Sequence, residues 1–93
     1  MSVPEDSAAL GVDFLVFPNP ARDQLNGILK GSGITDVQLT LIDVLGKEWY
    51  YMELETIETG KSFSIPVTGL PRGLYILKMT FGNHQKLFNV ILD

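Results

Sequence analysis

"VQLTLIDVLGKEW", residues 37–49, contains the pattern on which the fold depends. Val37, Leu39 and Leu41 alternate with polar residues, and a period of two places apolar side chains on one face of a β-strand. Residues 43–46 then end in a glycine at a position that requires positive φ, which predicts a tight hairpin with a bulge. The stretch therefore predicts two antiparallel strands that share one apolar face.

The same period of two recurs along the chain, at 63–67 and at 75–81, and no segment shows a sustained helical period. Turn signals follow one another at the spacing typical of an all-β sandwich or barrel. One apolar face per strand is what two packed sheets require, and Pro66 places its strand at an edge or ends it. We predict seven strands, at residues 12–17, 24–29, 35–43, 47–55, 61–67, 73–81 and 85–92.

Length and composition indicate a single domain of 93 residues, 45% of them hydrophobic. Residues 1–11 lack an apolar pattern and are predicted to be a flexible linker or lead-in, so the domain is expected to span 12–93. The net charge of −4 and the scattered basic residues argue against binding to nucleic acid or to anionic membranes. No apolar run is long enough to insert into a bilayer. No signal peptide is recognisable, which suits a cytoplasmic protein or a piece of a longer one.

A proline-rich turn follows the first predicted strand, in "FPNPARDQL", residues 17–25. Pro20 supplies the φ angle of the second position of a type I turn, and Asn19 is expected to cap that turn with its side chain. Asp23 is expected to accept backbone N–H groups just after it, before Leu25 returns to the core.

Catalytic and metal-binding patterns are absent from the sequence. The chain has no cysteine and a single histidine, His84, which lies in a predicted hairpin. Glu53 and Glu55 share one strand face and are best explained as a solvated surface. Asp23 and Asp43 lack the spacing of a calcium loop and suit turn capping better. We therefore expect no enzyme activity, no cofactor and no metal site.

Two aromatic residues suggest an alternative function. If Tyr50, Met52 and Leu54 face inward, Trp49 and Tyr51 lie on the outer face, where exposed aromatics could bind sugar rings. A bulge near Gly46 would exchange the two faces, and Trp49 could instead cap the edge of the sandwich. The alternatives are thus a carbohydrate-binding or adhesive module and a purely structural spacer.

Four stretches taken in order resemble one known family: residues 17–25, 37–49, "LPRGLYILKMTFG" at 70–82 and "QKLFNVILD" at 85–93. Together they are similar to the type A C-terminal sorting domain of the type IX secretion system (the Por secretion system). Each motif alone is an ordinary β-turn, whereas their order and spacing over residues 14–93 are specific. The matching positions are Pro18, Asn19, Pro20, Asp23, Leu25, Asp43, Gly46, Lys47, Leu70, Gly73, Tyr75 and Lys86. One departure is Asp93, where the family often ends on a basic residue.

The resemblance implies an immunoglobulin-like antiparallel β-sandwich without catalytic residues. It implies a fused N-terminal cargo, export through the periplasm to the cell surface or the extracellular space, and an origin in Bacteroidetes-type bacteria. The implied partners are the outer-membrane type IX translocon and a sortase-like surface protease, which commonly cleaves in the linker before Phe14.

Overall fold

The alternating segments form seven strands and no helix in the computed structural model, which describes residues 12–31 and 33–93. The strands are β1 (Val12–Phe17), β2 (Gln24–Gly31), β3 (Ile34–Asp43), β4 (Glu48–Ile57), β5 (Ser62–Pro66), β6 (Gly73–Phe81) and β7 (His84–Leu92). The seven predicted strands are confirmed, with ends that differ by up to two residues. The predicted lead-in, 1–11, lies outside the described residues.

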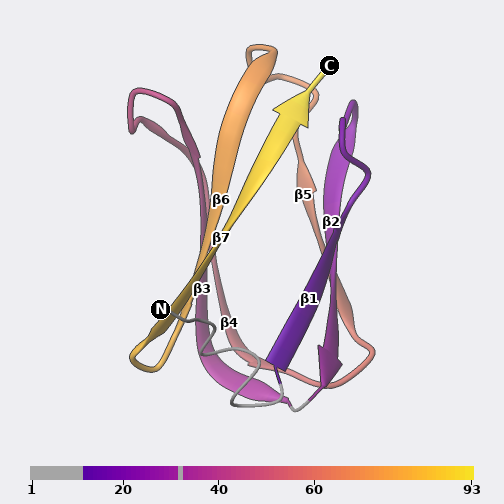
Figure 1. Ribbon diagram of the computed structural model, residues 1–93, viewed down its shortest axis with the longest axis vertical. Helices are drawn as coiled ribbons and strands as arrows, with labels where there is room; N and C mark the ends of the chain where they lie inside the picture. The colour runs from indigo at the N-terminus through magenta and orange to yellow at the C-terminus, as the bar shows by residue number, and fades with distance from the viewer. Residues whose placement is uncertain (1–11, 32) are drawn as a thin grey trace, which may run out of the picture.

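The strands form two antiparallel sheets that pack face to face (Figure 1). One sheet has the order β1-β2-β5 and the other has the order β4-β3-β6-β7. The prediction of an all-β, immunoglobulin-like antiparallel sandwich is confirmed. β5 is an edge strand that ends at Pro66, as expected from the missing N–H group of that residue.

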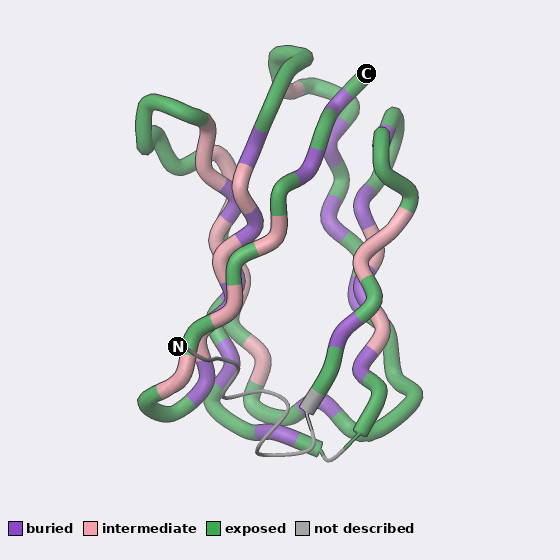
Figure 2. Tube along the Cα trace, viewed as in Figure 1, coloured by how far each residue is buried: buried purple, intermediate pink, exposed green. Residues whose placement is uncertain are grey.

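The core lies between the two sheets and is built from every second residue of most strands, as the alternation of buried and exposed positions shows (Figure 2). On β3, Val37, Leu39 and Leu41 are buried, as the sequence pattern predicted. The other buried hydrophobic residues are Phe14, Ala21, Leu25, Leu29, Ile34, Ile57, Phe63, Ile65, Val67, Tyr75, Leu77, Met79, Phe81, Val90 and Leu92.

Gly27 is the one glycine in the interior of a described strand whose missing side chain makes room for a neighbour. A Cβ atom on Gly27 would lie 2.3 Å from Cζ of Phe63, its cross-strand partner on β5. The aromatic ring of Phe63 therefore fills the space above the Gly27 backbone and contacts Phe14 at 6.5 Å between ring centroids.

The up-and-down course of the strands divides the connections between two ends of the sandwich. β1, β3, β5 and β7 all run toward the end that holds the C-terminus (Figure 1). We call this the C-terminal end; it comprises the loops 18–23, 44–47 and 67–72 together with Asp93. At the opposite end β2 ends and β3 begins, and the connections 58–61 and 82–83 lie there.

Candidate functional site

The motif residues predicted from the sequence, with one exception, gather at the C-terminal end, although they come from three separate parts of the chain (Figure 1). Lys86 is the exception, because it lies near the start of β7 at the opposite end. There its ammonium lies 3.8 Å from Oδ1 of Asp13 on β1, so it links the adjacent edges of the two sheets.

Asp43 organises the hairpin between β3 and β4. Its Oδ1 accepts the backbone N–H groups of Leu45 and Lys47, each at 2.9 Å, and its Oδ2 accepts the indole N–H of Trp49 at 2.9 Å. The hydrogen bond from Trp49, followed by that from the Lys47 backbone, lowers the pKa of the Asp43 carboxyl. Gly46 has a φ of 87° at the turn, which confirms the predicted need for glycine there.

Trp49 is the extra residue of a β-bulge in this hairpin. Tyr50 pairs with Leu41 and Glu48 with Ile42, so Trp49 has no partner of its own on β3. Its ring is half-buried against the core, and the ammonium of Lys47 lies 4.2 Å from the ring centroid. A cation at this distance is attracted to the ring face, so Lys47 and Trp49 pack against each other in the hairpin.

Tyr51 lies on the outer face of the sheet with 47% of its surface exposed. Its hydroxyl donates to Oε2 of Glu53 at 2.7 Å, and that bond raises the pKa of the phenol. Tyr50, Met52 and Leu54 pack against the core, as expected. Trp49 and Tyr51 thus have different surroundings, and the suggested sugar platform stays a prediction.

The proline-rich loop lies against the free edge of β7. The amide of Asn19 donates to the carbonyl of Asn89 at 3.1 Å and accepts the N–H of Ile91 at 3.0 Å. Ala21 continues the contact: its N–H donates to Ile91 at 2.7 Å, and its carbonyl accepts the N–H of Asp93 at 2.9 Å. Two motifs at the opposite ends of the domain sequence thereby meet.

The predicted role of Asn19 as the cap of its own turn is wrong. The peptides Phe17-Pro18 and Asn19-Pro20 are both cis, and the Asn19 side chain bonds instead to a strand about 70 residues away. The physical reason is that an unpaired strand edge offers an N–H and a C=O at the spacing of one amide side chain. The main chain of Asp23 links this loop to the loop after β5, because its carbonyl accepts the N–H of Val67 at 3.0 Å.

The loop before β6 is held by Gly73 and Tyr75. Gly73 has a φ of 145°, a conformation that side chains disfavour. Tyr75 is buried and its hydroxyl donates to the carbonyl of Pro71 at 2.5 Å. Burial raises the pKa of the Tyr75 phenol, and the nearby carboxylate of Asp43 raises it further.

Arg72 is a residue of this end that the sequence reasoning missed. Its guanidinium donates to the carbonyls of Arg22 (3.0 Å), Val67 (3.0 Å) and Thr68 (2.8 Å). It therefore ties the proline-rich loop of one sheet to the loop that crosses to the other. A lone arginine between proline and glycine gives no sequence signal for such a role, because the acceptors are backbone carbonyls.

A shallow hollow of about 250 Å³ separates the β3–β4 hairpin from the loop before β6. Its lining includes Asp43, Trp49 and Gly73. Val44 and Leu45 also line it, and at 65% and 90% exposed they are the most exposed large hydrophobic side chains among the described residues. The C-terminal end therefore offers a fixed surface with apolar and hydrogen-bonding groups.

The described residues hold no group of three or more histidine, cysteine, aspartate or glutamate side chains that could bind a metal ion. They also contain no helix able to cross a membrane.

These observations define a small immunoglobulin-like sandwich with motif-bearing loops at one end. The profile of the secretion system C-terminal sorting domain family matches residues 15–93, and the chain belongs to this family. It is a C-terminal sorting domain for type IX secretion, a signal for export toward the cell surface or the extracellular space. No curated protein matches the chain.

Proposed function

We propose that the domain acts as a non-catalytic secretion signal whose folded C-terminal end is bound by the outer-membrane translocon. The observation that carries this proposal is the convergence of the motifs. Asn19 binds β7, Arg72 binds the carbonyl of Arg22, and Asp43 and Gly73 border one hollow. The loops of the C-terminal end are fixed by hydrogen bonds within the domain. This end therefore keeps the same shape whichever cargo is fused to the domain.

The cargo is fused on the N-terminal side of the domain and crosses the periplasm before the translocon passes it through the outer membrane. A sortase-like surface protease then removes the domain by cleavage in the linker before Phe14. Any catalytic activity belongs to the cargo and to the protease. The domain supplies the surface by which the cargo is recognised for export.

The test uses a periplasm-directed fluorescent protein fused to residues 1–93 in a strain with an active type IX system. We expect the fusion to reach the surface or the medium. Changing the exposed Leu45 and Val44 to serine should cut export at least tenfold while the domain still unfolds at the wild-type temperature. The control is the double variant Leu15→Ser/Leu87→Ser, which makes two changes of the same kind at exposed leucines on β1 and β7. Normal export of the Leu45/Val44 variant, or wild-type fusion retained in the periplasm, would contradict the proposal.

A further inference from the structure

Among the described residues the sandwich has four edge strands, and three of them are protected along at least part of their length. β7 is covered near its end by Asn19 and Ala21. β5 is five residues long and ends at Pro66, and β1 is six residues long and ends before Pro18. Short strands and prolines are the usual means of preventing an edge from pairing with another chain.

β4 differs from these three strands. It is ten residues long, contains no proline, and pairs only with β3 among the described residues. Its bulge at Trp49 disturbs the first residues. From Tyr50 to Ile57 the pairing with β3 stays in one register, with an interruption opposite Glu55, where Asp36 of β3 has a φ of 55°. One side of this stretch therefore presents backbone N–H and C=O groups that no described strand uses.

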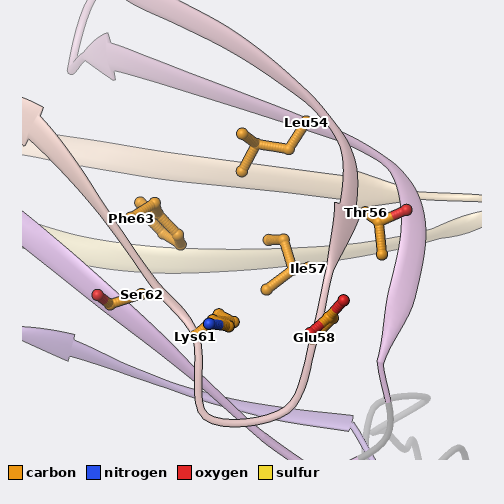
Figure 3. A pocket seen from close by; sticks show the side chains of 7 residues that line it. All are labelled: Leu54, Thr56, Ile57, Glu58, Lys61, Ser62 and Phe63. Carbon is orange, nitrogen blue, oxygen red and sulfur yellow. The ribbon is translucent and has the colours of Figure 1, made fainter.

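The inner face of β4 is also incompletely covered. Tyr50, Met52 and Leu54 pack on the core but remain half-buried, whereas Leu39 and Leu41 on neighbouring β3 are fully buried. A pocket of about 370 Å³ opens between β4 and β5. Figure 3 shows Leu54, Ile57 and Phe63 around this gap, with Glu58 and Lys61 at the turn below it.

The outer face of β4 is acidic. Glu53 and Glu55 are exposed at alternate positions, Glu48 lies at the start of the strand, and the strand has no basic residue. Side chains directly opposite one another on neighbouring antiparallel strands lie about 4.5–5.5 Å apart, close enough for opposite charges to attract. Basic residues at every second position of a partner strand would therefore favour its pairing with this edge.

We propose that the edge of β4 from Tyr50 to Ile57 binds an extended peptide segment by strand addition, and that this partner alternates basic and apolar residues. Its backbone pairs with the free edge of β4. Its basic side chains lie beside Glu53 and Glu55, and its apolar side chains extend the inner face over the pocket. Main-chain bonds supply affinity in such complexes and the alternate side chains supply specificity. This surface is separate from the C-terminal end and does not depend on the proposed export role.

The test titrates the isotopically labelled 93-residue chain with a capped ten-residue peptide of alternating lysine and valine. A peptide with glutamate in place of lysine serves as the comparison. We expect the basic peptide to protect alternate backbone amides between residues 50 and 57 from hydrogen exchange, and to bind at least tenfold more tightly than the acidic one. Equal affinity for the two peptides, protection at β5 or β7, or no binding at millimolar peptide would overturn the proposal.

Two further comparisons test the charge and the backbone pairing separately. Glu55→Lys should weaken binding of the basic peptide about fivefold, whereas Asp93→Lys, which changes the net charge equally, should leave it unchanged. In an extended strand the N–H groups of alternate residues point to the same edge, so those of the lysines point to one edge of the peptide and those of the valines to the other. N-methylation of either all lysines or all valines therefore removes the N–H groups of one edge. One of these two peptides should lose binding and thereby reveal the strand direction; full binding by both would exclude strand addition.

Discussion

At the residue scale, single side chains and single φ angles hold the loops of the C-terminal end. Asp43 uses both carboxylate oxygens within its own hairpin. Gly73 supplies a backbone angle that no other residue adopts at low cost. The loop shapes therefore depend on a few positions whose replacement has a defined local effect.

Gly73→Ala should destabilise the domain by about 1–3 kcal/mol, because a φ of 145° is strained for any residue with a Cβ. The strain is conformational, since no other group lies within 4 Å of an added Cβ at this position. Urea unfolding measures the change. Gly69→Ala is the matched control, because Gly69 also has open space around it but lacks a positive φ. Equal stability of the two variants would refute this explanation.

The hairpin should also respond to acid in a defined direction. The Asp43 pKa is lowered in the folded protein by the bond from Trp49 and then by that from Lys47. A carboxyl with a lowered folded-state pKa contributes stability above its unfolded pKa and loses it as pH falls through the folded one. The Trp49 indole N–H resonance should therefore shift with a midpoint below the ordinary aspartate value. Asp43→Asn should abolish that titration, and a midpoint at or above the ordinary value would contradict the assignment.

At the scale of the elements, packing between neighbouring strands depends on side chains of complementary size at paired positions. β2 and β5 approach with Phe63 lying over Gly27, and this contact fills the end of the core beside Phe14. The sequence pattern places both residues on strands, but their pairing follows from the register between β2 and β5.

Gly27→Ala should cost about 1–3 kcal/mol through overpacking, since the new Cβ would lie 2.3 Å from the Phe63 ring. Thermal or urea unfolding measures the loss. Combining the change with Phe63→Leu removes the clash, so the double variant should be more stable than the sum of the single effects predicts. Additive effects would show that the ring moves away freely.

At the scale of the whole molecule, contacts between distant segments join the two sheets. Asn19 and Ala21 bind β7 of the opposite sheet, and Arg72 connects the carbonyls of Arg22 and Val67. The C-terminal strand is thus held on one side by β6 and on the other by the proline-rich loop.

Asn19→Ala should release the end of β7, because it removes two hydrogen bonds, each with a net value of about 0.5–1.5 kcal/mol. We expect faster hydrogen exchange at the amides of Ile91 and Asp93, with little change in β3. Asn83→Ala, at the tip of a hairpin at the opposite end, is the control. Unchanged exchange at Ile91 would show that the loop does not protect this edge.

The sequence alone determined the strands, the inward residues and two of the hairpins. These features depend on period-two alternation and on glycine at positive φ, as at Leu39 and Gly46, and such local rules act between residues close in the chain. The tertiary structure alone decided what Asn19 and Arg72 do, that the predicted bulge of the hairpin falls at Trp49, and that the other motifs share one end while Lys86 lies at the opposite one. Those outcomes depend on strand order and register, because a side-chain amide or guanidinium bonds to whichever backbone groups the folded sheets bring to hydrogen-bonding distance, and no local pattern specifies them.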